Sequence, residues 1–217
     1  MFGLPPSLGA SADQPLRVVC LGAHADDIEI GAGGTVLRLL RERPHTDVRW
    51  AVLSATAERA AEARASAHAL LTGAARASVD VHDLDDGGFP QSLGRLRALL
   101  RDGLQAFAPH LVLTHRLDDA HQDHRAVAEV TWQTFRGAQI ATYEVPKWDG
   151  DLHPPNAYVV LQPEDLDRKL AVLADHFASQ RDKPWFDDET FRGLARVRGV
   201  EAGARYAEGF HCRKLVW

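Results

Sequence analysis

Residues 16–34 read LRVVCLGAHADDIEIGAGG, and this stretch decides the fold. Its first seven residues are mainly apolar and include two β-branched valines, which is typical of a buried strand. A polar turn follows that carries His24, Asp26 and Asp27 ahead of a glycine-rich run. Residues 35–44 then place apolar side chains at helical spacing up to a terminating proline. A strand, a polar turn and a helix in this order predict the first unit of an α/β sheet.

The same alternation of strand and helix continues through about the first 140 residues. Further strands are predicted at 48–54, 78–84, 110–114, 140–145 and 157–161, and further helices at 56–71, 93–107, 125–135, 165–179 and 190–200. The tail 209–217 fits neither pattern. Strands that alternate with helices favour right-handed crossovers and a parallel sheet. We therefore expect a flexible N-terminal arm, residues 1–15, and one Rossmann-like α/β domain, residues 16–217, with a mostly parallel sheet flanked by helices.

The composition excludes several classes of function. Lys and Arg number 25 against 30 Asp and Glu, and the resulting net charge of −5 argues against a nucleic-acid or anionic-membrane binder. No run approaches the roughly 18 apolar residues of a membrane span. The chain has only 2 cysteines, too few for a disulfide framework, which suits a reducing compartment. We expect a cytoplasmic protein.

Histidines are numerous, 11 in all, and polar side chains gather after three of the predicted strands. They are His24, Asp26 and Asp27 after the first strand, Asp85 and Asp86 after the third, and the segment HRLDDAHQDH at 115–124 after the fourth. Ligands of open α/β sheets bind at the carboxyl ends of the strands. The polar clusters therefore predict a functional site at that edge of the sheet.

Two short motifs in these clusters offer ligands for a metal. His24 and Asp27, three residues apart, can wrap around one ion, and HQDH at 121–124 can complete a set of two histidines and one aspartate. Nitrogen and carboxylate ligands suit Zn²⁺ or a similar ion, and three protein ligands leave a position for water. Asp27 or Asp123 taken alone is equally suited to capping a helix N-terminus.

These residues resemble a known family. AHADDIEIGAGGT at 23–35 is similar to the AHPDDxExGxGGT signature of the PIG-L (LmbE-like) family of zinc-dependent N-acetylglucosaminyl deacetylases, and HQDH is similar to that family's HPDH motif. ERAAEARASAHALL at 58–71 fits the family's Arg-x-x-Glu helix, and RGVEAGARYAEGF at 198–210 resembles its closing segment. The resemblance extends over residues 16–212.

The resemblance implies a metal site. His24, Asp27 and His124 would bind one Zn²⁺ per chain, with Fe²⁺ as the alternative. The chain departs from the family at two positions, because Ala25 and Gln122 stand where each motif usually has proline. Proline stiffens a turn and supplies no ligand, so the ligand set is intact and the shape of the pocket rim is what the change affects.

The resemblance also implies catalytic and substrate-binding roles. Asp26 would be the general base that acts on a metal-activated water, and His121 would stabilise the oxyanion and protonate the leaving amine. Asp123 would orient the His121 imidazole. Arg59 and Asp86 would contact the sugar. This division of labour suits amide hydrolysis, which needs a nucleophilic water, charge stabilisation and a proton for the amine.

We therefore expect a zinc-dependent hydrolase that removes the N-acetyl group from a small N-acetylglucosamine-type sugar conjugate. Two alternatives are a metal-dependent hydrolase of another amide or ester, and a metal-binding or sugar-binding protein without turnover. Asp26 and His121 favour turnover, since neither is needed merely to hold a metal. A nucleotide binder is disfavoured because GAGG at 31–34 matches neither phosphate-binding fingerprint and instead favours close helix–sheet packing. Homo-oligomerisation is left open.

Overall fold

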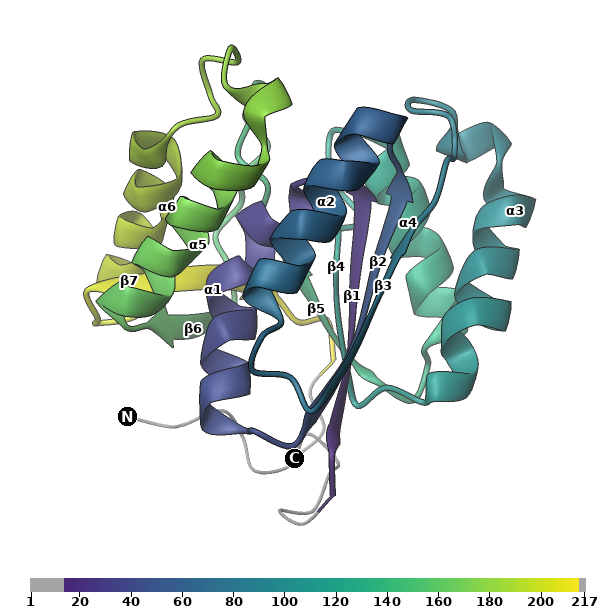
Figure 1. Ribbon diagram of the computed structural model, residues 1–217, viewed down its shortest axis with the longest axis horizontal. Coiled ribbons are helices and arrows are strands. Elements are labelled where there is room, and N and C mark those ends of the chain that lie inside the picture. Colours follow the sequence, from purple (N-terminus) through teal and green to yellow (C-terminus); the bar gives the residue numbers. More distant parts are fainter. Residues whose placement is uncertain (1–13, 215–217) are drawn as a thin grey trace.

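The computed structural model of the protein describes residues 14–214 (Figure 1). The predicted flexible arm, residues 1–15, falls outside this range except for its last two residues. The end of the unassigned tail, residues 215–217, lies outside it as well.

The described residues form one seven-stranded sheet in the order β3-β2-β1-β4-β5-β7-β6. The strands are β1 (Leu16–His24), β2 (Thr46–Ser54), β3 (Arg76–Val81), β4 (Leu111–Thr114), β5 (Gln139–Tyr143), β6 (Ala157–Leu161) and β7 (Tyr206–His211). The first five strands are parallel, whereas β7 lies antiparallel between β5 and β6. The expected single α/β domain with a mostly parallel sheet is confirmed.

Helices cover both faces of the sheet (Figure 1). They are α1 (Asp27–Glu42), α2 (Ala57–Leu70), α3 (Leu93–Ala98), α4 (Gln122–Thr134), α5 (Pro163–His176) and α6 (Asp188–Glu201), with short turns η1 (Phe89–Gln91), η2 (Leu99–Leu104), η3 (Gln105–Phe107) and η4 (Ala178–Gln180). Alternate residues of β1 enter two cores, Val18 and Cys20 beneath α1, α2 and α5, and Val19 and Leu21 beneath α3 and α4. Within residues 14–214, no helix combines the length and apolar character of a bilayer span.

Three differences from the sequence prediction stand out, besides shifts of a few residues at the ends of other elements. Helix α1 begins at Asp27, so the glycine-rich run lies inside the helix rather than in the turn before it. The segment 93–107 is helical but changes from α3 to a π-helical turn and then a 3-10 turn. The start of the unassigned tail completes β7, which adds the antiparallel strand next to β5.

The glycines of α1 bring the helix close to the sheet. A Cβ atom on Gly31 would lie 2.6 Å from Cγ of Tyr143, and one on Gly34 would lie 2.6 Å from Cδ1 of Leu161. Real side chains do not approach so closely, so only glycine lets α1 lie this near β5 and β6. The predicted helix–sheet packing is confirmed at these two positions.

Strand order places the polar turns side by side. The sheet extends in one direction from β1 to β3 and in the other from β4 onward, so a topological switch point lies between β1 and β4. The turn after β1 carries His24, and the loop after β4 leads to His121. Ligands of such sheets bind in the crevice at this point.

We predict that Gly31→Ala destabilises the protein, because the added methyl group overlaps the Tyr143 ring. Overpacking of this kind costs about 1–3 kcal/mol. Gly193→Ala in α6 is the control, since nothing lies within 4 Å of its added Cβ and alanine is the better helix former by about 1 kcal/mol. Urea denaturation measures both variants, and equal or greater stability of Gly31→Ala would contradict the packing argument.

Candidate active site

The turn between β1 and α1 is held in an unusual backbone conformation. Asp26, the N-cap residue of α1, has φ 95° and makes no side-chain capping bond. A left-handed backbone is rare for residues other than glycine, and such strain clusters at functional sites. Arg59 of α2 stabilises the turn, because its guanidinium donates to the Ala25 carbonyl and lies 3.1 Å from Oδ2 of Asp26. The buried Asp26 carboxylate is therefore free of a capping role.

Asp27 does not cap the helix in the ordinary way either. Its Oδ2 accepts the main-chain N–H of His24 at 2.7 Å, a bond that folds the turn back on itself. At the start of α4 the cap is the imidazole of His121, whose Nδ1 accepts the N–H of Asp123 at 3.2 Å. Neither Asp27 nor Asp123 therefore uses its carboxylate to cap its own helix.

The carboxylate of Asp123 points away from its own helix. It accepts the N–H groups of Gly87 at 2.6 Å and Phe89 at 3.1 Å, and its Oδ2 lies 3.2 Å from Nε2 of His24. Among the described residues, the hydrogen bond that joins Asp123 to His121 runs through the main-chain N–H instead. The carboxylate was expected to orient His121, but the geometry directs it to His24 and to the loop after β3.

The expected metal ligands converge on one carboxylate oxygen. Oδ2 of Asp27 lies 3.5 Å from Nδ1 of His24 and 3.5 Å from Nε2 of His124. Nε2 of His124 is buried and has no hydrogen-bond partner among the described residues. The outer nitrogen of each histidine meets a carboxylate, His24 at Asp123 and His124 at Asp119 (2.9 Å). This pattern is typical of metal-ligating histidines, so the residues fit a divalent metal.

Donor atoms in the same region form three overlapping groups within 4.8 Å. The groups are His24, His121 and His124; His24, Asp86, His121 and Asp123; and Asp27, His115 and His124. Every expected ligand belongs to at least one group. The expected set of His24, Asp27 and His124 is not itself one of the three, and its members are joined through the Asp27 contacts given above.

Burial and neighbouring charge separate the two adjacent aspartates. Burial raises the pKa of Asp26 to about 6, against the opposing effect of the Arg59 guanidinium. Burial acts on Asp27 in the same direction, but the imidazoles of His124 and His115 hold the pKa of Asp27 well below its usual value. Asp27 therefore stays ionised, as a carboxylate ligand of a metal must be, whereas Asp26 can exchange a proton near neutral pH.

The imidazole of His121 is neutral in this arrangement. Burial, together with the neighbouring His124 and His24, lowers the pKa of His121 to about 4. Because Nδ1 accepts a hydrogen bond, the proton of a neutral ring sits on Nε2. His121 therefore has an N–H available as a donor at the site.

The two residues expected to bind sugar occupy different environments. Arg59 is mostly buried, and besides its bonds to the β1–α1 turn it donates to Oγ of Ser179 at 3.2 Å. Asp86 is largely exposed, with one oxygen 3.1 Å from Nε2 of His24. Both line the cleft described next, so both are within reach of a ligand.

A cleft of about 480 Å³ lies over these groups. Its floor and walls include His24, Asp26, Asp27, Arg59, Asp86, His121, His124, Lys147, Trp148, Gln180, Lys183 and Trp185. The volume is within the range of small-molecule sites. Trp148 and Trp185 are the aromatic residues that face it, whereas Tyr143 is fully buried and donates its hydroxyl hydrogen to the Leu21 carbonyl.

Sequence reasoning missed or left open three residues that support the site. Asp119 accepts the His121 N–H and meets His124, and the acidic run before HQDH was its only signal. His115, the first residue of the polar segment 115–124, is fully buried, with its ring stacked on that of His124 at 3.8 Å and its Nε2 3.3 Å from Oδ2 of Asp27. Glu62 accepts both the N–H and the hydroxyl of the serine that contacts Arg59, which the Arg-x-x-Glu spacing could have indicated.

Proteins that differ in activity share this fold. The conserved protein TT1542 from Thermus thermophilus matches with a TM-score of 0.71 and 22% identity over 93% of this chain and 96% of that chain. GalB, the 4-carboxy-2-hydroxymuconate hydratase from Pseudomonas putida, matches at 0.70 and 20% over 93% and 98%. N,N'-diacetylchitobiose deacetylase from Pyrococcus horikoshii matches at 0.68 and 21% over 94% and 88%. At these identities the likeness establishes the fold alone.

The family comparison is more specific. The family model described as PIG-L, GlcNAc-PI de-N-acetylase, matches residues 19–135, just over half of the 217-residue chain. The matched region contains both motifs and the Arg-x-x-Glu helix. The chain therefore belongs to the PIG-L family of GlcNAc-PI de-N-acetylases, as the motifs predicted, and is an N-deacetylase of the hydrolase class.

Proposed function

We propose that this protein is a metal-dependent hydrolase that removes the N-acetyl group from an amino-sugar conjugate. One observation carries the proposal: a buried carboxylate free of capping, a neutral imidazole with an available N–H and a set of metal donors line the same cleft. A base, an oxyanion donor and a Lewis-acid site are the parts that amide hydrolysis requires.

We assign the ligand role to His24, Asp27 and His124, with zinc as the favoured ion and Fe²⁺ as the alternative. Asp119 and Asp123 orient the two imidazoles through their outer nitrogens. When bound, a divalent metal supplies a Lewis acid and lowers the pKa of a water molecule toward about 7. The open cleft above the donors gives the substrate access to this position.

Asp26 and His121 divide the proton transfers. Asp26 accepts a proton from the attacking water, a role that suits a carboxyl group with a pKa of about 6. The Nε2–H of His121 hydrogen-bonds to the developing oxyanion. As the C–N bond breaks, the leaving nitrogen takes a proton through His121, and the proton held by Asp26 replaces it, so both residues end in the states in which they began. Acetic acid and a free amine are the first products: one proton of the water has gone to the amine, and the other is released when the acid ionises to acetate.

The family and the cleft both support this substrate class. The cleft is large enough for a sugar ring and part of an attached group, and its walls carry hydroxyl-binding charges and two indoles. Arg59 and Asp86 are our candidates for contacts to the sugar, and Arg59 also maintains the turn that bears Asp26.

The experiment that tests the proposal measures acetate release from a panel of N-acetylglucosamine conjugates, with other amides and esters as comparison substrates. We expect acetate from at least one conjugate and loss of that activity after chelation of the metal. Release only from the comparison substrates would favour hydrolysis of another bond, and no release from any would favour a binding protein.

We predict that Asp26→Asn retains its metal and loses acetate release by about 10²-fold or more, since the amide cannot accept the proton. Metal content is measured by mass spectrometry beside the turnover assay. Asp102→Asn, on the exposed turn η2 where Asp102 pairs with Arg101, is the control and keeps its activity. An Asp26→Asn enzyme with full activity would remove Asp26 from the role of base.

We also predict that Asp119→Asn weakens metal binding, because the His124 imidazole loses its carboxylate partner. Loss of such a partner typically weakens affinity by about 10–100-fold. The adjacent Asp118→Asn is the matched control, since Asp118 is exposed and pairs with Arg116 instead. Competition with a chromogenic chelator measures both, and equal affinities would contradict the orienting role of Asp119.

A further inference from the structure

The loop between β5 and β6, residues 144–156, forms one wall of the cleft; we call it the rim loop. It presents Lys147 and Trp148 to the cleft. Trp148 is 68% exposed and lines the cleft, so its indole has surface available to a ligand.

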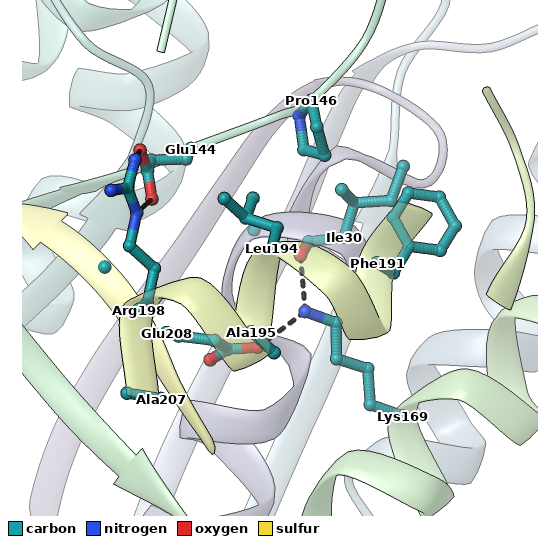
Figure 2. A pocket seen from close by; sticks show the side chains of 12 residues that line it. Ile30, Glu144, Pro146, Lys169, Phe191, Leu194, Ala195, Arg198, Ala207 and Glu208 are labelled. Carbon is teal, nitrogen blue, oxygen red and sulfur yellow. Dashed lines mark hydrogen bonds and ion pairs between the residues drawn. The ribbon is translucent and has the colours of Figure 1, made fainter. Parts of the chain in front are cut away.

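One buried guanidinium joins the two stems of the rim loop. Arg198 of α6 makes a bidentate pair with Glu144, Nη2 to Oε1 at 2.6 Å and Nε to Oε2 at 2.9 Å (Figure 2). Its Nη2 also donates to the carbonyl of His153 at 3.3 Å, on the returning stem. Both members of the pair are almost fully buried.

We call these bonds of Arg198 to Glu144 and His153 the Arg198 clamp. Its geometry requires arginine. Nη1 of Arg198 is engaged by Glu201 at 2.9 and 3.0 Å, so one planar group serves two carboxylates and a carbonyl. Lysine carries the same charge but cannot hold these acceptors in one plane.

The far part of the loop is tied to the metal-binding segment. The Asp151 carboxylate accepts the N–H of Ala120, the residue before His121, at 2.8 Å. The carbonyl of Asp151 accepts from Arg116 at 2.8 Å. Lys147 and Trp148 thus lie between the Arg198 clamp and an anchor on the HQDH segment.

We infer that Arg198 is a positioning residue for substrate recognition, which fixes the rim loop so that Trp148 and Lys147 contact the part of the conjugate beyond the acetylated sugar. The indole stacks on a second ring of the substrate, and the ammonium binds its oxygen substituents. The inference rests on the proposed function. It separates recognition of the attached group, at the rim, from the chemistry at the floor.

The first test measures hydrogen–deuterium exchange of the rim-loop amides in the metal-loaded protein. Arg198→Lys and the double variant Arg198→Met, Glu144→Gln remove the clamp, and the double variant leaves no unpaired buried carboxylate at position 144. We expect exchange at 145–153 to be about tenfold faster in both. Arg192→Met is the control, because Arg192 lies on the same helix but pairs with exposed aspartates. Unchanged exchange in the Arg198 variants would overturn the inference.

The second test compares N-acetylglucosamine with N,N'-diacetylchitobiose, which adds a second ring. In Arg198→Lys we expect KM for the disaccharide to rise about tenfold, with kcat within about twofold and metal content unchanged. KM for the monosaccharide should change little, and Trp148→Ala should reproduce the pattern. Equal increases in KM for both substrates, or a fall in kcat with KM unchanged, would show that Arg198 has only a structural role and would overturn the inference.

The two tests separate this inference from the proposed function. A wild-type protein that hydrolyses neither probe contradicts the proposed function for these sugars, and with it the recognition of a second ring. The exchange measurement still decides whether Arg198 holds the rim loop, since it does not depend on turnover.

Discussion

The site depends on one buried carboxylate. Oδ2 of Asp27 accepts a main-chain N–H and lies within 3.5 Å of imidazole nitrogens of His24, His115 and His124, which come from three separate segments. A buried carboxylate stays ionised only where donors and positive charge surround it. The first turn of α1 must therefore lie directly against the crevice between β1 and β4. The glycines of α1 make this position of the helix possible, because they let it approach β5 and β6.

Buried charges also hold this helix, further along its length. The Glu208 carboxylate accepts the N–H groups of Gly34 and Thr35, and the Lys169 ammonium lies 2.7 Å from it and donates to the Ile30 carbonyl (Figure 2). These main-chain groups belong to the interior of α1, which a side chain seldom reaches. The ion pair thus joins α1 to β7 and α5. Residues beyond the family match at 19–135 are in this way part of what positions Asp27.

Much of the fold was predictable because its signals are local. Strand and helix periodicity predicted the first six strands, and the motif residues after β1 and β4 do meet at one crevice. The residues that support the site were harder to predict from the sequence. The sequence alone does not distinguish Asp118 from Asp119, because both are aspartates in the same run. The loop conformation decides that Asp119 reaches His124 whereas Asp118 pairs with Arg116. The direction of the Asp123 carboxylate depends on the loop after β3, which no local pattern places. The antiparallel β7 was missed for the same reason, since its pairing with β5 and β6 is entirely nonlocal.

The position of Asp26 at the start of α1 is compatible with the role of base that we propose for it. An aspartate at an N-cap ordinarily accepts N–H groups of its own helix, and those bonds would keep its pKa low. The left-handed backbone turns this carboxylate away from the helix, and burial then raises its pKa. The strain is offset by Arg59, which bonds to the Ala25 carbonyl and is itself linked through Ser179 to Glu62. The Arg59 guanidinium is already bonded to other groups of the protein. The main effect of the Arg-x-x-Glu helix is therefore to stabilise the turn between β1 and α1. In our proposal, discrimination among substrates therefore depends more on the rim loop, where Trp148 is exposed at the cleft.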